Sequence, residues 1–469
     1  MTAFSRPCLL IIPKQMFSLF SVVLLSACSS SSGLEVASPP IAVESCVVKE
    51  PRHAVSIDSE TAKRLEAVVR QYVDAGIVPG AVLQIEQEGG PVVSFAYGVS
   101  DLKSEKQMES DALFRLYSMT KPITSLATMR FVESGQISLD DPVGDYLPEF
   151  RQSRVYGGDF RPGQPILRPI SIRDLLTQTA GIAYRTDQDT IGRIYARKGI
   201  PAGPGVADPP TDGSPPVESL AELSTRVADT PLRTHPGDAW SYGNATDVLG
   251  RVLEVVTGKT LEQVLREEVL QPIGMNDTSF TVSPQQRSRL TSAYINPMPK
   301  QSGSGVLDNL NADELVRPNL IVADPADASI FSSQPEIAFG GAGLAGTAND
   351  YLRLTRMLRS GGEIDGTRVV TQRSIELMRS NHLADPVRKS AETLGGLGFG
   401  LGFAVKDRPI AGKEFFPECA YFWGGAASTF FWIDPAGEIT GVLMTQVFGG
   451  DTSSMWIAVL RELYSSQSG

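Results

Sequence analysis

The sequence has few of the side chains that bind metals or act as imidazole bases, with only three histidines and four cysteines among 469 residues. No group of them has the spacing of a metal site, so we expect no metal centre and no cofactor. A Ser-His-Asp triad would need His235 or His382, and neither lies in a recognisable triad setting. A Gly-x-Ser-x-Gly motif is also missing, which argues against an α/β-hydrolase.

Positive charge is scarce as well. Lys and Arg number 42 against 53 Asp and Glu, and the formal net charge is −11. Because nucleic-acid binding needs clustered lysines and arginines, we expect no nucleic-acid partner. The hydrophobic share of 42% and the charged share of 20% are typical of a globular core. The oligomeric state stays open.

The apolar run at residues 16–28, MFSLFSVVLLSAC, is too short to span a bilayer as a helix and is typical of a signal peptide. It ends in LSAC, which resembles a bacterial lipobox whose cysteine, here Cys28, is lipidated. We therefore expect a lipoprotein signal peptide at residues 1–28 and a tether at residues 29–58. The protein would be exported and held on the periplasmic side by a lipid anchor at Cys28, in the outer membrane because Ser29 follows. A plain secretory signal is the alternative.

Export would place Cys46 and Cys419 in an oxidising compartment, where they could pair and close a loop across nearly the whole fold. Two unpaired thiols are the alternative that the sequence leaves open.

The hydrophobic pattern predicts strands near both ends of the chain and helices between them. Strand-like runs occupy residues 80–87 and 92–99, and return at residues 397–405, 427–435 and 439–447. Helices are predicted at residues 59–76, where Ser59 would be the cap, and from Ser118, Ser171, Asn244 and Asn349, with a last helix at the C-terminus. Stretches at residues 199–216 and 297–336 are loop-like.

This order predicts an α/β domain built from residues 59–139 and 337–469, with a helical domain that carries long loops, residues 140–336, inserted into it.

The first candidate for chemistry is Ser118-Met119-Thr120-Lys121. On a helix, positions i and i+3 share a face, so the serine hydroxyl and the lysine amine can touch. A neutral Lys121 would serve as base, which requires burial to lower its pKa from about 10.4 towards 7. The spacing alone is a weak signal, since a Ser cap with a surface lysine has it too. A second copy, from Ser100 to Lys103, lacks the apolar helix and is interpreted as a solvated turn.

The second candidate is Tyr242-Gly243-Asn244, at the start of a predicted helix that Asn244 would cap. A tyrosine hydroxyl can relay a proton between the serine and a leaving group. The similar Tyr294-Ile295-Asn296 lies in a loop and is set aside.

The third candidate is Trp423-Gly424-Gly425, which enters a predicted strand. Paired glycines allow a ligand to approach the backbone, as an amide donor to an oxyanion requires. The alternative is a strand-entry turn with a core tryptophan.

Together these motifs resemble the serine β-lactamase and penicillin-binding-protein superfamily, and are most similar to the family VIII carboxylesterases, which are like class C β-lactamases. The phrases FRLYSMTKPITS, LLTQTAGI, PGDAWSYGN and GGAGLAGTANDYLRL match as well, and the resemblance extends from about residue 60 to the C-terminus.

The resemblance implies a β-lactamase-like α/β (α+β) fold, with an antiparallel sheet flanked by helices, an inserted helical domain and a site between them. It implies an acyl-enzyme on Ser118, with Lys121 and Tyr242 sharing the base role as a coupled pair. The amides of Ser118 and Ala426 would form the oxyanion hole, and Asn244 would orient Lys121.

Two positions depart from the family pattern. Trp423 stands where many β-lactamases and D-Ala-D-Ala peptidases have the lysine of Lys-Thr-Gly. Losing that cation removes a contact to a substrate carboxylate worth about 1.5–3 kcal/mol and favours a neutral, apolar group. Gln178 stands where many relatives have histidine, and we interpret it as structural.

These observations predict a serine carboxylesterase acting on short-chain esters, which are small-molecule substrates. The alternatives are a β-lactamase or D-Ala-D-Ala carboxypeptidase, and a catalytically inert, surface-anchored binding protein.

Overall fold

The computed structural model describes these parts of the chain: residue 46 and residues 55–158, 163–205, 211, 213, 215–297, 319–449 and 453–464. They fall in one compact unit, Ile41–Gly469. The predicted signal peptide, Cys28 and most of the predicted tether lie outside the described residues. Within the described part, no helix combines the length and apolarity needed to cross a bilayer.

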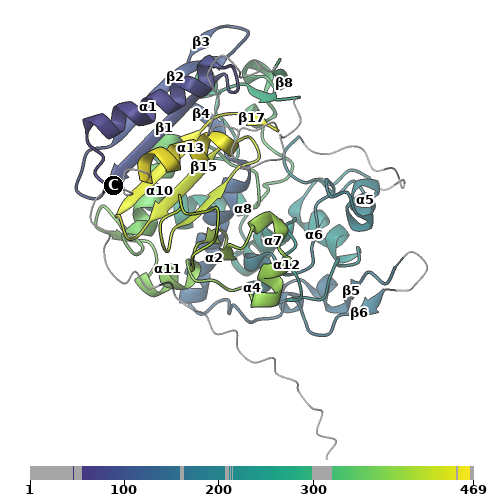
Figure 1. Ribbon diagram of the computed structural model, residues 1–469. Helices are drawn as coiled ribbons and strands as arrows, with labels where there is room; N and C mark the ends of the chain where they lie inside the picture. The colour runs from purple at the N-terminus through teal and green to yellow at the C-terminus, as the bar shows by residue number, and fades with distance from the viewer. Residues whose placement is uncertain are drawn as a thin grey trace, which may run out of the picture. The chain divides into compact units, whose positions relative to one another are not determined.

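An eight-stranded antiparallel sheet forms the centre of the fold (Figure 1). Its strands lie in this order: β12 (Gly398–Phe399), β13 (Ala404–Val405), β14 (Tyr421–Gly424), β15 (Phe430–Asp434), β16 (Ile439–Met444), β1 (Gly80–Gln87), β2 (Val93–Asp101) and β3 (Lys106–Gln107). Strand β1, from the start of the fold, pairs with β16, from its end, and places Leu83 opposite Leu443. The prediction that both ends of the chain build one sheet is confirmed.

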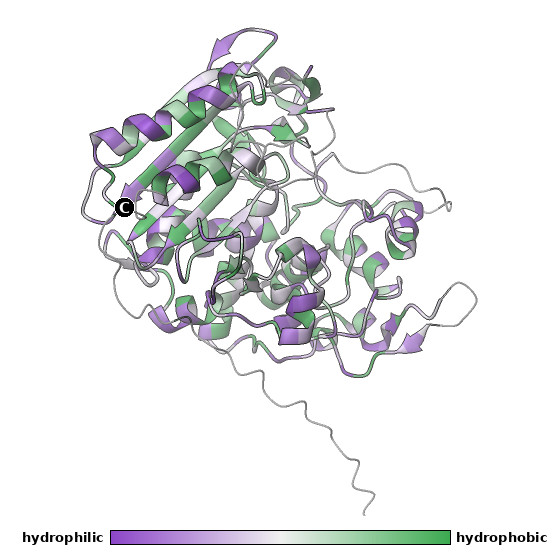
Figure 2. Ribbon diagram, in the orientation of Figure 1, coloured by the Kyte–Doolittle hydropathy of each residue, from purple (hydrophilic) through white to green (hydrophobic). Residues whose placement is uncertain are grey.

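Helices cover both faces of this sheet. On one face, α1 (Ser59–Asp74) packs on β1 and β2 and against α13 (Ser453–Tyr464), whose Trp456 stacks on Phe430 of β15. Leu65, Val69 and Leu83 belong to one apolar cluster on this face. On the other face, α10 (Ala348–Arg359) packs on β1, β15 and β16. Figure 2 shows that the central strands are largely hydrophobic, whereas hydrophilic residues alternate with hydrophobic ones along α1. Burial on both faces explains why β15 and β16 are apolar almost throughout, whereas β2 is only partly buried and the edge strand β3 is exposed.

Helix α2 (Thr120–Glu133) connects the sheet to the remaining helices. It is buried on nearly all sides, as expected of a helix whose residues are small or apolar all round. It packs against α7 (Ala245–Thr257) and α8 (Leu261–Leu265), and α7 packs in turn against α4 (Ile172–Thr177) and α6 (Leu220–Ala228). The start of α2 is thus held between the sheet and these helices.

Shorter elements complete the described fold. They are β4 (Leu113–Arg115), α3 (Val143–Tyr146), β5 (Arg154–Val155), β6 (Gln164–Pro165), α5 (Thr190–Arg197), α9 (Gln271–Ile273), β7 (Ala293–Ile295), β8 (Ile321–Asp324), β9 (Ala345–Thr347), β10 (Glu363–Ile364), β11 (Thr367–Arg368), α11 (Gln372–Met378), α12 (Asp385–Ser390) and β17 (Val447–Phe448). Strand β17 joins β7 in a second sheet, so the C-terminal part of the chain also pairs with the middle part. The division into two domains stays a prediction.

Three local expectations differ from the structure. Helix α1 is capped by the side chain of Asp58 and not by Ser59. Asn244 precedes α7, but its side chain makes no capping bond, because it is used elsewhere. The run at residues 397–405 forms two short strands instead of one, since Gly402 adopts a φ of +106° between them.

Cys46 and Cys419 form a disulfide, with their Cα atoms 5.5 Å apart. The structure thus decides between the two alternatives that the sequence left open. The bridge joins residues separated by 373 positions and ties the start of the described chain to the segment that enters β14.

Candidate active site

Ser118 lies in a short 3₁₀ turn, η1 (Tyr117–Met119), between β4 and α2. The preceding residue, Tyr117, has a φ of +43°, which non-glycine residues rarely adopt. Its ring is buried edge-on against Phe331 and Phe448, and burial raises the pKa of its hydroxyl to about 12. Packing of this ring holds the strained turn that presents Ser118 at the start of α2.

Lys121, in the first turn of α2, is brought to Ser118 as the spacing predicted. Its Nζ atom donates to Ser118 Oγ at 3.3 Å, to the hydroxyl of Tyr184 at 3.0 Å and to the carbonyl of Gly341 at 2.8 Å. The side chain is 1% exposed. A buried ammonium is tolerated here because each of these groups offers it an oxygen.

In this arrangement the pKa of Lys121 is shifted upwards, and the neutral Lys121 expected from the sequence stays a prediction. Burial by itself lowers the pKa of Lys121, but the phenol groups of Tyr184 and Tyr242 oppose it through charge and hydrogen bonding and raise the pKa above its ordinary value. Burial alone, which the sequence suggests, would lower the pKa of Lys121. The acceptors that oppose this effect come from other parts of the chain and cannot be identified from the local sequence.

Tyr242 lies beside Lys121, with the ring centre 4.5 Å from Nζ. The indole N–H of Trp423 donates to the Tyr242 hydroxyl at 3.2 Å. Behind it, the side chain of Gln178 accepts from the N–H of Gly243 at 3.1 Å. Gln178 therefore braces the Tyr242 turn, in agreement with a structural role.

Aromatic rings surround Tyr242. Trp240 stacks on it at 5.5 Å between ring centres, and Tyr184 meets it edge-on at the same distance. Phe399 and Trp423 close the cluster, 5.2 Å apart. Tyr184 was not identified from the sequence, although it follows the LLTQTAGI phrase closely, because nothing in its local pattern distinguishes it from a core tyrosine.

Asn244 does not contact Lys121 directly, which corrects the expected role. Its amide nitrogen donates to Asp247 Oδ2 at 2.8 Å and to the Pro201 carbonyl at 3.0 Å. The amide oxygen, which alone could accept from an ammonium, is buried without a partner among the described residues. The link to Lys121 is indirect, because Asp247 Oδ1 accepts from the Gly341 N–H at 2.8 Å while Gly341 O accepts from Lys121.

Asp247 is a second residue that the sequence motifs did not reveal. Burial raises the pKa of its carboxyl group above the ordinary value, and the charge of Lys121 opposes that shift. The carboxyl and the ammonium are therefore linked through one residue, Gly341, whose N–H donates to Asp247 and whose carbonyl accepts from Lys121.

The Trp423-Gly424-Gly425 segment lies at the end of β14, next to the turn that carries Ser118. A Cβ atom on Gly425 would lie 2.4 Å from the carbonyl oxygen of Leu116, so only glycine permits this approach. Ala426 follows as an exposed residue. The participation of the Ser118 and Ala426 amides in an oxyanion hole stays a prediction.

The rival motifs have structural roles. Lys103 of the second Ser-x-x-Lys copy is largely exposed, at 85% of its side chain, in a loose pair with Asp327, and Ser100 donates to Lys106 O. The hydroxyl of Tyr294 accepts from the N–H of Leu102.

His382, one of the two histidines available to a triad, is buried, and burial lowers the pKa of its ring to about 4. Its ring contacts Leu377 O and Arg173. In the described part of the chain, no three metal-binding side chains gather into a site.

The sequence of this chain is similar to a known family and to characterised proteins. The beta-lactamase family model matches residues 65–463. Esterase EstB of Burkholderia gladioli is 31% identical over 421 residues, covering 88% of this chain and 97% of that protein. Lovastatin esterase of Penicillium rubens is 27% identical over 402 residues, covering 81% of this chain and 91% of that protein.

Among solved structures, EstCE1, described as a hydrolase with promiscuous acyltransferase activity, superposes with a TM-score of 0.69 at 28% identity. It covers 87% of this chain and 100% of its own. The family resemblance and the β-lactamase-like fold predicted from the motifs are confirmed. This chain therefore belongs to the beta-lactamase family and is a hydrolase of the beta-lactamase-like fold.

Proposed function

We propose that this protein is a serine carboxylesterase that hydrolyses short-chain esters through an acyl-enzyme on Ser118. The observation that carries the proposal is the hydrogen-bonded group of Ser118 Oγ, Lys121 Nζ and the Tyr184 hydroxyl, with Tyr242 against the same ammonium. The similarity to Esterase EstB and to lovastatin esterase supports ester substrates.

In the first half of the reaction, Ser118 Oγ attacks the ester carbonyl and its proton passes to the group formed by Lys121, Tyr184 and Tyr242. These residues titrate as a unit, and the active form is the one that has lost one proton. The member of the group that has lost its proton, the amine of Lys121 or the phenolate oxygen of Tyr242, takes the proton of Ser118. The same proton is given to the departing alcohol.

In the second half, water attacks the acyl-enzyme and the same group accepts its proton. The carbonyl carbon is released as a carboxylic acid, and Ser118 regains its hydroxyl hydrogen. Two backbone amides, those of Ser118 and Ala426, would stabilise the oxyanion in each half.

Trp423 supports an ester in preference to a β-lactam or a D-Ala-D-Ala peptide. Its indole is neutral, and its N–H is directed to the Tyr242 hydroxyl. The site thus lacks, at this position, the cation that would pair with a substrate carboxylate.

The decisive experiment compares the wild type with Ser118→Ala on p-nitrophenyl acetate and butyrate. We expect kcat to fall at least about 10³-fold, because no other group can form the acyl-enzyme. Ser100→Ala, in the second Ser-x-x-Lys copy, is the matched control and should retain activity. Undiminished turnover by Ser118→Ala would contradict the proposal.

Two further assays separate the alternatives. Family membership favours a β-lactamase or D-Ala-D-Ala carboxypeptidase as second candidate, and nitrocefin turnover much faster than that of any simple ester would establish it. Intact protein that gains no mass at Ser118 from a fluorophosphonate would indicate an inert binding protein.

A further inference from the structure

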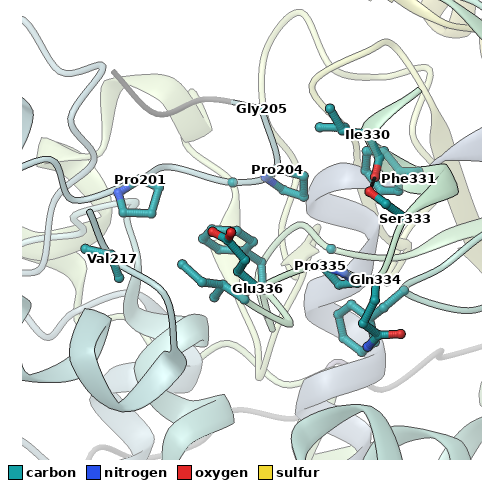
Figure 3. A pocket seen from close by; sticks show the side chains of 15 residues that line it. Pro201, Pro204, Gly205, Val217, Ile330, Phe331, Ser333, Gln334, Pro335 and Glu336 are labelled. Atoms are coloured by element: carbon teal, nitrogen blue, oxygen red, sulfur yellow. Dashed lines mark hydrogen bonds between the residues drawn. The ribbon is translucent and has the colours of Figure 1, made fainter. Parts of the chain in front are cut away.

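An apolar cavity of about 330 Å³ opens between two loops that lie far apart in the sequence (Figure 3). One side is formed by the Pro/Gly-rich segment from Pro201 to Gly205 together with Val217, and the other by the segment from Ile330 to Phe339. The volume lies within the range of small-molecule sites. None of Ser118, Lys121 and Tyr242 lines it, so the cavity is separate from the reacting groups.

The cavity nevertheless borders the catalytic group at its base. Phe339 and Gly343, which line it, lie two residues on either side of Gly341, whose carbonyl accepts from Lys121. Consecutive Cα atoms are about 3.8 Å apart, so the Cα atoms of Phe339 and Gly343 each lie within about 8 Å of the Cα atom of Gly341.

Two other contacts connect the cavity to the site. The ring of Phe331, in the cavity wall, meets the ring of Tyr117 at 6.2 Å, and Tyr117 directly precedes Ser118. The carbonyl of Pro201, on the opposite wall, accepts from the amide of Asn244. A molecule in the cavity would therefore lie against residues that position both Ser118 and the tyrosine turn.

The lining carries one ionisable group, the exposed carboxylate of Glu336. Figure 3 shows it between Val217 and Pro335. Among the described residues, no cation forms an ion pair with Glu336. The side-chain amide of the nearby Gln334 already donates a hydrogen bond to Glu262. The cavity is thus apolar in its walls and negative at its rim.

We propose that this cavity binds the hydrocarbon group of the ester substrate remote from the scissile bond, and that it prefers neutral or cationic groups to anionic ones. The proposal rests on the proposed function and adds a substrate class to it: esters with an extended apolar acyl or alcohol part that carries no negative charge. The apolar walls select by size, and the rim carboxylate repels anions.

The kinetic test uses Ile330→Trp, which enlarges a lining residue that is 44% exposed. Ile330 already faces Gly205, where a Cβ atom would lie 2.8 Å from Ile330 Cδ1, so an indole here narrows the cavity. Val255→Trp, at a residue that is 42% exposed on α7 and outside the lining, is the matched control.

Both variants are assayed on p-nitrophenyl acetate and hexanoate, and on ethyl and hexyl acetate. We expect Ile330→Trp to lower kcat/KM about tenfold for the substrate whose chain enters the cavity, and less than twofold for the short ones. A lower kcat/KM with p-nitrophenyl hexanoate would show that the acyl chain occupies the cavity. A lower kcat/KM with hexyl acetate would show that the alcohol chain occupies it. Equal losses on short and long esters, or none, would overturn the proposal.

A binding test does not depend on catalysis. Calorimetry with Ser118→Ala should show hexyltrimethylammonium binding about two- to fivefold more tightly than the hexanoate anion, and Glu336→Gln should abolish the difference. Ile330→Trp on the same background should prevent binding. If the wild type hydrolyses no ester, the proposed function fails; if Ser118→Ala binds no hexyltrimethylammonium, the cavity assignment fails.

Discussion

The protonation state of Lys121 depends on residues that are distant in the sequence. The Tyr184 hydroxyl is 63 positions away and the Gly341 carbonyl 220 positions away, yet both accept hydrogen bonds from Nζ. Burial lowers the pKa of Lys121, and the Tyr184 and Tyr242 hydroxyls act in the opposite direction and raise it above its ordinary value. At the scale of single residues, the proposed base is therefore a cluster and not a lysine alone.

Tyr184→Phe tests this cluster. The change removes an acceptor from the Lys121 ammonium, and a hydrogen bond to a charged group is worth about 1.5–3 kcal/mol, so we expect kcat to fall about 10- to 150-fold with little change in KM. Because the Tyr184 phenol raises the pKa of Lys121, its loss should lower that pKa and move the alkaline limb of the pH–rate profile to lower pH.

Tyr97→Phe is a suitable control, because the Tyr97 hydroxyl contacts Asp74 in an exposed pair outside the site. An unchanged kcat and an unchanged alkaline limb in Tyr184→Phe would remove Tyr184 from the mechanism.

At the scale of secondary-structure elements, the site depends on how closely the end of β14 approaches the turn before Ser118. Gly425 makes this possible, because a side chain there would collide with the Leu116 carbonyl oxygen at 2.4 Å and with Thr429 Oγ1 at 2.2 Å. The turn after β14 is itself held by the Gly425 N–H, which donates to Thr429 O at 2.8 Å.

Gly425→Ala should therefore move the Ala426 amide away from Ser118. We expect kcat to fall about 10²–10³-fold, the effect of losing one oxyanion donor, with the fold retained. Gly90→Ala, in the β1–β2 turn, is the control, since its Cβ would come no closer than 3.2 Å to the nearest heavy atom. Normal kcat in Gly425→Ala would place the oxyanion hole elsewhere.

At the scale of the whole molecule, the central sheet is closed by strands from both ends of the chain, and the Cys46–Cys419 disulfide joins the same two regions. Such a bridge restricts the unfolded chain over 373 positions, so its entropic effect is large. Disulfides of this kind are formed in oxidising compartments, and the expected export stays a prediction.

The double variant Cys46→Ser/Cys419→Ser should therefore be less stable by about 2–5 kcal/mol in guanidinium unfolding under oxidising conditions. Added reductant should bring the wild type to the same midpoint. Identical unfolding midpoints of variant and wild type would show that the bridge contributes nothing to stability.

We also propose that the molecule is anchored through lipid on Cys28, on the basis of the lipobox-like LSAC. A diacylglyceryl group with an amide-linked chain holds a protein stably, whereas one chain does not. Full-length protein should thus fractionate with membranes, and Cys28→Ala should be soluble. Wild-type protein found wholly in the soluble periplasmic fraction, without lipid mass on its N-terminal peptide, would favour the plain secretory signal.

The sequence alone was sufficient to predict the local geometry and the family. The Ser118–Lys121 contact was predicted from the i, i+3 spacing next to an apolar helix, whereas the same spacing at Ser100 and Lys103 gives no such contact. The strands at both ends follow from runs of apolar residues, since a sheet covered on both faces must be apolar on both. Three motifs in order then predicted the family that the comparisons confirm.

Only the tertiary structure decided what surrounds those motifs. Tyr184, in the loop after α4, and Asp247, in α7, carry no local signal, and they enter the site because α7 packs against both α2 and α4. The Asn244–Asp247 contact is itself local, between positions i and i+3 at the start of α7. Cys46, in contrast, meets Cys419 because the two ends of the chain share one sheet. The charge of a buried lysine is set by its neighbours in space, and a pattern along the chain does not specify them.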